Sequence, residues 1–163
     1  MPKPTTSEDK TICINRKARF DYEIEETYEA GIVLTGGEVK SLRDGRAQLK
    51  DSYGRVDKGE MTLINAHINA YGPAHFFNVD STRTRKLLMH KKEIMRLMGK
   101  IQEQGLTLIP LRLYFKSGRA KVELALARGK KRYDKRETIR AREVQRDIAR
   151  GMQRNFREQS RKT

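Results

Sequence analysis

Regularly spaced arginines near the end of the chain have the type and spacing to bind a polyanion. The cationic set, one residue in every four, is Arg142, Arg146, Arg150 and Arg154. An apolar set with the same spacing, two residues later, is Val144, Ile148, Met152 and Phe156. At about 100° per residue in a helix, the two sets lie on nearly opposite faces. Because guanidinium groups make strong hydrogen bonds to phosphate oxygens, the spacing indicates a basic amphipathic helix that contacts phosphates.

A second group of cations directly precedes this stretch, and it comprises Arg128, Lys130, Lys131, Arg132, Lys135 and Arg136. Residues 128–163, here called the tail, hold 14 of the 36 Lys and Arg but only 5 of the 21 Asp and Glu. Like charges at this density repel within a Debye length of about 8 Å, and an isolated helix is only marginally stable in water. We therefore expect the tail to be disordered when free and helical in phosphate-rich surroundings, where folding is coupled to binding.

The positive charge extends to the whole chain. Its 163 residues carry a formal net charge of +15, and the isoelectric point is near 10.1. A surplus of this size favours nucleic acid as the partner, with anionic membranes second. Two other interpretations of the tail are a solvated segment that adds only solubility and a membrane-surface helix, although its apolar stripe has few of the large aromatics that interfaces favour.

The remaining composition points to the cytoplasm. No apolar run is long enough to span a bilayer, and the polar N-terminus lacks the apolar region of a signal peptide. The single cysteine, Cys13, excludes an internal disulfide and a thiolate metal cluster, and we interpret it as a packed, reduced thiol. We therefore expect a cytoplasmic protein without membrane contact.

Signals for catalysis are absent from the sequence. The three histidines, His67, His75 and His90, do not have the spacing of a metal-ligand set. No P-loop, Gly-x-Ser-x-Gly motif or dinucleotide fingerprint occurs. The Gly36-Gly37 pair is explained better by a helix start than by a phosphate cradle. We expect no enzymatic activity, no cofactor and no metal.

Before the tail, alternating apolar residues predict a folded domain built from β-strands. Residues 1–12 have no apolar period and predict a flexible leader. In residues 20–34 the even positions are almost all apolar or aromatic, which predicts a long strand with one buried face, bent or bulged at Gly31. Thr35 and Glu38 have the spacing of a capping box that begins a short helix ended by Gly45.

The middle of the chain predicts further strands around one helix. Residues 47–56 and 61–68 alternate as two strands joined by a turn at 57–59, and residues 71–79 form a loop. In that loop Phe76 and Phe77 either pack inward or stack on RNA. Residues 84–104 carry apolar side chains at spacings of three, four and seven, which predicts an amphipathic helix ended by Gly105.

Two more strands precede the tail, at residues 106–115 and 120–127, joined by a hairpin at Ser117-Gly118 with Pro110 at an edge or bulge. The whole order predicts a mainly β fold: a small closed antiparallel β-barrel of the oligonucleotide-binding type, with inserted helices and the basic C-terminal tail. An open α+β sandwich is the main alternative. The expected domains are a flexible leader (1–12), an RNA-binding β-barrel (13–127) and the tail (128–163).

Short motifs spread along the chain resemble one known family. They are Asn-Arg-Lys-Ala-Arg at 15–19, Asp-Tyr at 21–22, Gly-Glu-Val-Lys-Ser-Leu-Arg at 37–43, Asp-Ser-Tyr at 51–53, Asn-Ala-His-Ile at 65–68, Arg-Thr-Arg-Lys-Leu-Leu at 83–88, Gly-Lys-Lys at 129–131 and Asp-Lys-Arg at 134–136. Each is weak alone, but together and in this order they are similar to the SmpB family. The resemblance covers nearly the whole chain.

The resemblance implies a function and partners. It implies a monomer with an oligonucleotide-binding-type barrel that binds the tRNA-like domain of transfer-messenger RNA and delivers it to stalled ribosomes for trans-translation. The tail would probe the decoding centre and the empty messenger channel of the small subunit. Alanyl-tRNA synthetase and elongation factor Tu would be partners through the RNA. A general RNA-binding or ribosomal module without a rescue role is the rival interpretation.

The resemblance also implies site residues. Those expected to contact the tRNA-like domain are Arg16, Lys17, Arg19, Glu29, Lys40, Arg43, Arg83, Arg85, Lys86, Leu88 and His90. Those expected to contact the ribosome are Lys130, Lys131, Tyr133, Asp134, Lys135, Arg136, Arg142, Arg146, Arg150 and Arg154. Among these, Tyr133 would stack on an unpaired base, and the lysines and arginines of the tail would neutralise phosphates.

Overall fold

The computed structural model describes residues 9–72 and 80–161. The chain divides into two compact units, the first ending at Gly129 and the second beginning at Lys130. The last strand of the first unit continues to Gly129, two residues into the segment assigned to the tail from the sequence. Phe76, Phe77 and His75 lie outside the described residues.

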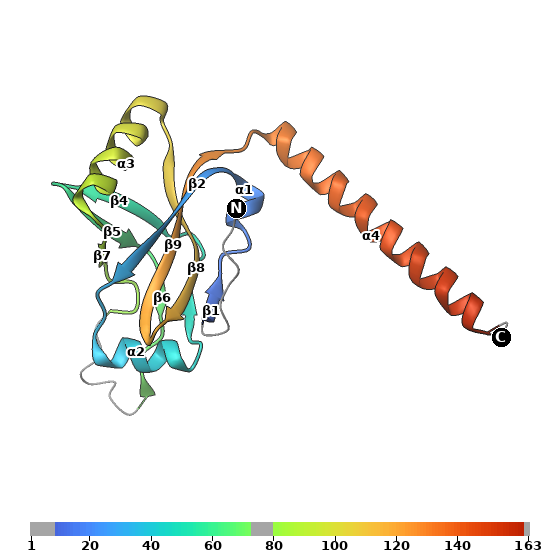
Figure 1. Ribbon diagram of the computed structural model, residues 1–163, viewed down its shortest axis with the longest axis horizontal. Helices are drawn as coiled ribbons and strands as arrows, with labels where there is room; N and C mark the ends of the chain where they lie inside the picture. Colours follow the sequence, from blue (N-terminus) through green and yellow to red (C-terminus); the bar gives the residue numbers. More distant parts are fainter. Residues whose placement is uncertain (1–8, 73–79, 162–163) are drawn as a thin grey trace. The chain divides into compact units, whose positions relative to one another are not determined.

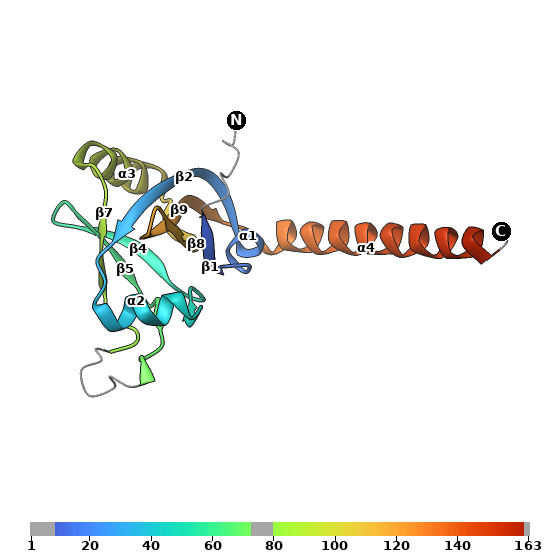
Figure 2. The same cartoon turned by 60° about the horizontal axis from the view of Figure 1, so that its bottom comes forward.

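Six antiparallel strands close into a ring, as Figures 1 and 2 show. They are β2 (Tyr22–Ile32), β4 (Tyr53–Asp57), β5 (Glu60–Ile64), β7 (Arg85–Leu88), β8 (Thr107–Lys116) and β9 (Arg119–Gly129). The order is β8-β4-β5-β7-β2-β9, and β9 pairs back onto β8. Because the sheet closes on itself, the barrel is confirmed over the open sandwich, and the architecture fits the oligonucleotide-binding type.

Two smaller strand pairs complete the β structure. β1 (Lys10–Ile14) pairs with β8, on the edge that β8 also offers to β4. β3 (Ala47–Gln48) pairs with β6 (His67–Ile68) outside the ring. The leader predicted for residues 1–12 is therefore wrong for residues 10–12, whose backbone is held in a ladder although their side chains show no clear apolar period.

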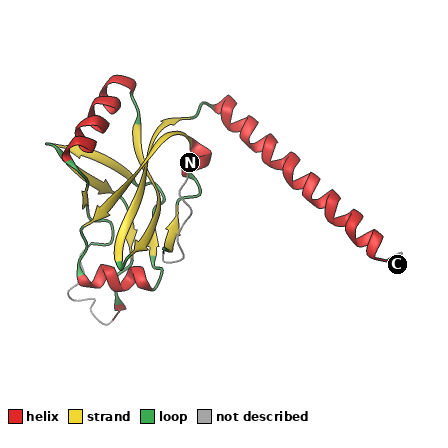
Figure 3. Ribbon diagram, in the orientation of Figure 1, coloured by secondary structure: helices red, strands yellow, loops and turns green. Residues whose placement is uncertain are grey.

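Four helices are described: α1 (Ala18–Asp21), α2 (Gly36–Arg43), α3 (Lys91–Gln104) and α4 (Arg132–Arg161). Figures 1 and 3 show α2 and α3 at opposite ends of the ring. Leu42 of α2 and Leu97 of α3 belong to the same buried cluster as Leu63, Leu87 and Leu124 of the strands. At about 1.5–3 kcal/mol for each buried leucine, these helices stabilise the barrel by covering its ends.

Two bulges divide the apolar residues between an inner and an outer core. The ladder of β2 and β9 shifts register between Ile24 and Glu26, and the ladder of β8 and β9 shifts between Pro110 and Arg112. Beyond the first shift, Tyr28 packs against the inner core, whereas Ile24 packs with Ile109 in a small cluster under α1. The bend or bulge predicted at Gly31 thus lies at Glu25. Of the edge or bulge predicted at Pro110, the structure shows a bulge, directly after this residue.

Helix ends and tight turns follow the sequence closely. The amide of Glu38 donates to Thr35 Oγ1 at 3.4 Å, and the amide of Thr35 donates to Glu38 Oε2 at 2.9 Å, so the capping box is confirmed. Gly45 and Gly105 follow α2 and α3 with φ of 72° and 63°. Such left-handed conformations favour glycine because it has no Cβ.

One predicted helix begins seven residues later than expected. Residues 85–88 form strand β7, which pairs with β5 through Leu87 and with β2 through Leu88. Arg85 and Leu87 are buried while Lys86 and Leu88 are exposed, which is the alternation of a strand. The pairing with two strands overrides the helical spacing of the leucines.

Among the described residues, no helix combines the length and the apolarity needed to cross a membrane.

Strands β4 and β8 come close together at a glycine, where a larger side chain should destabilise the barrel. β4 and β8 pair through Gly54 and Leu108, and a Cβ added to Gly54 would lie 3.0 Å from Leu108 Cβ. We expect Gly54→Ala to destabilise the barrel by about 1–3 kcal/mol, because the two strands would have to separate. Urea unfolding followed by tyrosine fluorescence would measure this change.

A matched control for this variant is Gly99→Ala. Gly99 lies within α3, and an added Cβ would meet no heavy atom within 4 Å. There the substitution should stabilise by up to about 1 kcal/mol, since alanine favours helix. Equal unfolding midpoints for the two variants would contradict the role given to Gly54.

Candidate nucleic-acid interface

A carboxylate is held in place on the outer face of the barrel. Glu29 of β2 accepts a hydrogen bond from the hydroxyl of Tyr114 of β8, and Lys116 Nζ lies 3.1 Å from Glu29 Oε2. The hydrogen bond from Tyr114 and the neighbouring lysines hold the pKa of Glu29 below its ordinary value, against the effect of partial burial. Glu29 therefore remains an ionised acceptor with a fixed orientation at neutral pH.

Leu88 lies on the strand next to β2, and His90 follows it at the start of α3. Leu88 pairs with Gly31 across β7 and β2, and its side chain is 54 % exposed. His90 follows two residues after the end of β7. His90 occupies the N-cap position of α3, where its exposed side chain makes no capping hydrogen bond. The register thus places Leu88 beside Gly31, two residues along β2 from Glu29.

Beside this group the surface forms a pocket of about 340 Å³. It is lined by Gly31, Ile32, Leu34, Val39, Leu88, Phe115, Gly118, Arg119, Ala120 and Lys121. Its lining combines the end of β2, one residue each of α2 and β7, and the β8–β9 hairpin, whose turn residues Ser117 and Gly118 have φ of 51° and 73°. Apolar side chains and two cations therefore share one concave surface.

Arg85 is a core residue, which corrects its prediction as an RNA contact. Its side chain is fully buried, and its guanidinium donates to Glu38 Oε1 at 2.9 Å and to the carbonyl of Ala66 at 2.6 Å. Arg83 binds the same carboxylate, with its Nη2 2.7 Å from Glu38 Oε2. A guanidinium with internal partners and no exposed surface is unavailable to RNA, since exposing it would leave Glu38 with an unmatched buried charge.

The same cluster explains the ionisation of Glu38. Burial raises the pKa of its carboxyl, but hydrogen bonds from Arg83, from the Thr35 amide and from Arg85 together hold it below the ordinary value of 4.5. Glu38 therefore both begins α2 and ties this helix to β7. Arg83 remains partly exposed, at 27 % of its side chain, so one of the two arginines can still reach a partner.

The other predicted cations of the barrel are exposed but spread over several elements. Arg16 precedes α1, Arg19 lies in α1, and Lys40 and Arg43 lie in α2. Lys40 Nζ stands 5.3 Å from the centre of the Tyr71 ring. Lys86 Nζ pairs with Glu60 at 2.8 Å, with both side chains at least half exposed. Exposed pairs of this kind contribute about 0–1 kcal/mol, so Lys86 can exchange its partner for a phosphate.

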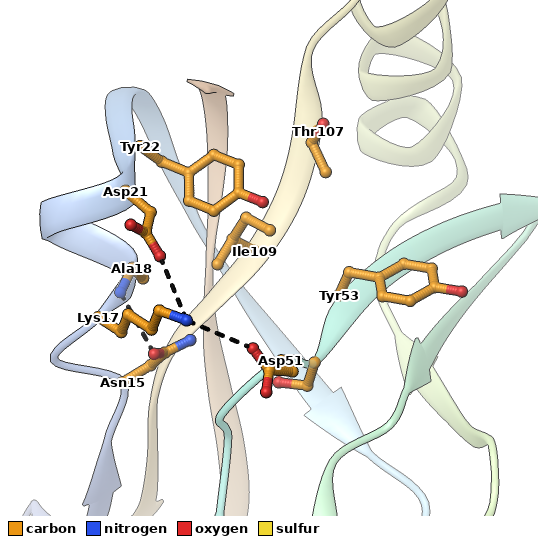
Figure 4. A pocket seen from close by; sticks show the side chains of 10 residues that line it. Asn15, Lys17, Ala18, Asp21, Tyr22, Asp51, Tyr53, Thr107 and Ile109 are labelled. Atoms are coloured by element: carbon orange, nitrogen blue, oxygen red, sulfur yellow. Dashed lines mark hydrogen bonds and ion pairs between the residues drawn. The ribbon is translucent and has the colours of Figure 1, made fainter. Parts of the chain in front are cut away.

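Lys17 lies at a second pocket, of about 360 Å³. Figure 4 shows its amine between Asp21 and Asp51, each 3.8 Å away, while the rings of Tyr22 and Tyr53 line the same pocket. The buried Asn15 fixes this region, because its amide donates to the carbonyls of Leu49 and Pro110 at 3.2 and 3.0 Å. The first residues of the 15–19 motif are therefore partly structural.

The second unit is described mainly by α4. The four arginines of the stripe at 142, 146, 150 and 154 are exposed, and Asp134 accepts a hydrogen bond from the Lys131 amide at 3.3 Å, at the start of the helix. The apolar stripe is also exposed, with Val144 at 57 % and Met152 at 68 %. The side chain of Tyr133 lies outside the described residues, although its backbone belongs to α4.

Within the described residues, no group of three His, Cys, Asp or Glu side chains lies close enough to hold a metal ion. Cys13 is half-buried against the barrel core, and burial raises the pKa of its thiol to about 11 despite a hydrogen bond from the Leu113 backbone. A thiol with this pKa is protonated at neutral pH and unreactive.

The residues that sequence reasoning missed come from the β8–β9 hairpin. Tyr114 orients Glu29, Lys116 pairs with it, and Arg119 and Lys121 line the neighbouring pocket. Residues 116–121 read Lys-Ser-Gly-Arg-Ala-Lys, so three cations in six residues were a detectable signal. Their proximity to Glu29 was not detectable, because it depends on the register of β2 and β9.

Comparison with known proteins decides the family of this chain. The family model described as SmpB protein matches residues 12–154, which includes the barrel and α4 up to the last arginine of the stripe. This chain belongs to the SmpB family. The match therefore spans both units, and the resemblance drawn from separate motifs is confirmed.

Individual SmpB relatives support the same assignment. The chain is 63 % identical over 142 residues to the SsrA-binding protein of Desulforudis audaxviator (strain MP104C), covering 87 % of this chain and 93 % of the relative. It is 57 % identical over 150 residues to the SsrA-binding protein of Geobacillus thermodenitrificans (strain NG80-2), covering 92 % and 95 %. Among solved structures, one described as "tmRNA-SmpB: a journey to the center of the bacterial ribosome" has 52 % identity and a TM-score of 0.64, covering 78 % of this chain and 94 % of the other.

Proposed function

We propose that this protein binds the tRNA-like domain of transfer-messenger RNA, also called SsrA RNA, and delivers it to stalled ribosomes for trans-translation. The observation that carries this function is the SmpB family match across residues 12–154. The relatives named SsrA-binding protein and the solved tmRNA-SmpB ribosome structure support the two partners. The protein contributes binding and positioning, with no chemistry and no cofactor of its own, and it acts in the cytoplasm as a monomer.

In this proposal the barrel recognises the RNA. Glu29, Leu88 and His90 offer an oriented anion, an apolar contact and a ring on one face. A carboxylate next to RNA is an acceptor for base amino groups or ribose hydroxyls, whereas the surrounding lysines meet the phosphates. Arg16, Lys17, Arg19, Lys40, Arg43, Arg83 and Lys86 supply the remaining positive charge.

The tail is the part that contacts the ribosome. The exposed arginines and the exposed apolar stripe of α4 need a partner surface, because helix propensity alone stabilises an isolated helix poorly. The expectation that the tail is disordered when free and helical in the messenger channel remains a prediction. Tyr133, at the base of the helix, would stack on an unpaired base of the decoding centre at about 1–3 kcal/mol. Alanyl-tRNA synthetase and elongation factor Tu would join the complex through the RNA.

Sequencing the RNAs that copurify with the tagged full-length protein from its own cells tests this function. We expect enrichment of one RNA that combines a tRNA-like end with a short reading frame, because the barrel face recognises a folded RNA and not a general polyanion. Enrichment of ribosomal RNA alone would contradict the proposal and favour a ribosomal module without a rescue role. A variant that ends at Gly129 serves as the control for ribosomal RNA carried by the tail.

A further inference from the structure

Two short strands on the outside of the barrel line one groove without pairing with each other. β1 is the end strand of the seven-stranded sheet, and within the described residues it pairs only with β8. β3 pairs only with β6, in a sheet of its own. A groove of about 360 Å³, here called the β1–β3 groove, is lined by residues 13–17 and 47–50 alone. It therefore runs between two strand edges that have no partner strand among the described residues.

The backbone of β1 turns hydrogen-bonding groups away from its own sheet. The amide of Asn15 donates to the carbonyl of Leu111 at 2.7 Å, and such bonded positions alternate along an antiparallel ladder. The amide and carbonyl of Ile14 therefore point away from β8. In the described part of the chain, Ile14 uses neither group in a hydrogen bond. The edge of β1 can thus accept an added strand.

The opposite wall has the same property. The amide of Asn69 donates to the carbonyl of Arg46 at 3.1 Å, so the alternation points the amide and carbonyl of Ala47 away from β6. These two groups also make no hydrogen bond to another described residue. The buried amide of Asn15 donates to the carbonyl of Leu49 at 3.2 Å, which joins the two walls at one point. The groove is therefore held at a fixed width by a side chain and not closed by a ladder.

The charged residues that line the groove are all cations. Arg16 and Lys50 are exposed, and neither forms an ion pair with another described residue. The exposed Ile14 and the buried Leu49 add aliphatic surface. No aromatic ring is among the lining residues, so the groove lacks the stacking surface on which unpaired bases bind. The chemistry of the groove therefore fits an acidic peptide better than RNA.

We propose that the β1–β3 groove binds an extended acidic segment of a partner protein, which pairs with Ile14 as an added strand and places carboxylates on Arg16 and Lys50. Peptides bind open sheet edges in this way, because backbone hydrogen bonds supply affinity and alternate side chains supply specificity. Arg16 is also among the cations proposed for RNA, so the segment and the RNA compete for it. The inference adds a protein partner and does not depend on the proposed function.

The strand pairing is tested with Ile14→Pro in the full-length chain, against a fluorescent peptide of alternating glutamate and valine. Proline removes the amide that faces the groove and no bond of the β8 ladder, and edge strands tolerate it there. We expect binding at least about tenfold weaker by fluorescence anisotropy, since an edge hydrogen bond is lost and the strand is blocked. The control Ile14→Ala keeps the amide and should cost about threefold. Equal losses for the two variants would overturn the pairing.

Hydrogen exchange in the wild type tests the same contact without any substitution. When the peptide saturates the protein, exchange of the Ile14 amide should slow at least about tenfold, because the amide enters a hydrogen bond. An unchanged exchange rate would overturn the proposal, even if Ile14→Pro fails to fold.

The charge of the groove needs its own control, because the cationic tail attracts any acidic peptide. Lys50→Glu should weaken peptide binding about fivefold, whereas Lys58→Glu, exposed on the same unit but outside the groove, should change it less than about twofold. Equal losses would show general electrostatics and overturn the proposed contact. A short oligouridine is the second probe. If Ile14→Pro weakens its binding as much as that of the peptide, the groove is an RNA site and the protein partner is refuted.

Discussion

Removal of residues 130–163 is expected to abolish peptide tagging on stalled ribosomes while leaving the affinity for the tRNA-like domain within about threefold at physiological salt. The physical reason is the division of the chain into two units between Gly129 and Lys130. The barrel face around Glu29 is complete in the first unit, whereas the exposed arginines of α4 belong to the second. Filter binding and a tagging assay with a messenger that lacks a stop codon would measure the two quantities.

The truncation point matters because of the strand that ends the barrel. Gly129 and Arg128 pair with Tyr22 and Glu23, and Arg128 Nη2 lies 3.5 Å from Glu25 Oε1. A chain cut before Arg128 would lose part of this ladder, so loss of RNA affinity could then come from a frayed barrel. Loss of affinity in the chain that ends at Gly129, with an unchanged unfolding midpoint, would contradict the assignment of RNA recognition to the barrel.

A milder version of this experiment keeps the tail and removes two of its positive charges. Replacing Arg146 and Arg150 by glutamine should lower the salt slope of ribosome association by about 0.9 for each phosphate that is no longer neutralised, if the screening resembles that of a duplex. Arg150 also lies 3.8 Å from Asp147, an exposed pair that contributes little. Glu143→Gln, on the same helix, changes charge in the other direction and is the control.

Neutralising Glu38 is expected to produce the largest loss of stability of any single charge change in the barrel. Glu38→Gln should lower the free energy of unfolding by about 3 kcal/mol, because it leaves the fully buried guanidinium of Arg85 without its counter-charge. The same change also weakens the ion pair between Arg83 and Glu38 and the hydrogen bond from the Thr35 amide that completes the capping box of α2. Urea unfolding at pH 7 is the measurement.

The neighbouring residue of β7 supplies a matched control. Lys86 pairs with Glu60 at 2.8 Å, the same separation as that of Arg85 and Glu38, but both side chains are largely exposed. Glu60→Gln should therefore cost less than about 1 kcal/mol. Similar losses for the two variants would show that burial of the pair does not set its contribution.

The dependence on pH gives an independent check of the same cluster. Because the pKa of Glu38 in the folded protein is below its ordinary value of 4.5, its ionised form contributes stability that is fully present above pH 4.5. That contribution is lost as the pH falls through the folded-state pKa. The difference in unfolding free energy between wild type and Glu38→Gln should therefore shrink below pH 4.5, and a constant difference would contradict the assignment.

Local sequence signals determined much of the fold. The capping box at Thr35 and Glu38, the glycines that end α2 and α3, and the two-residue turn at Ser117 and Gly118 all depend on residues within a few positions of one another. The alternation of β9, and the amphipathic pattern of α3 after Lys91, were readable for the same reason. The charge of the tail and its helical spacing likewise required no tertiary information.

The tertiary structure decided which residues meet. Residues 85–88 carry helical spacing, but pairing with β5 and β2 makes them a strand, and this burial turns Arg85 from a candidate RNA contact into the partner of Glu38. The bulge at Glu25 moves the side chains of β2 from the outer cluster to the inner core. Register and bulges depend on which strands pair over long separations, and one shifted residue reverses every face.

The candidate site shows the same difference between what local sequence signals determine and what the tertiary structure decides. The sequence alone indicated a strongly cationic chain that resembles the SmpB family, because charge, motifs and periodicity are properties of the chain itself. Only the closed ring placed Glu29 beside Tyr114 and Lys116, and Gly31 between Leu88 and Lys121. These contacts join residues more than fifty positions apart, and the packing of the whole barrel sets them.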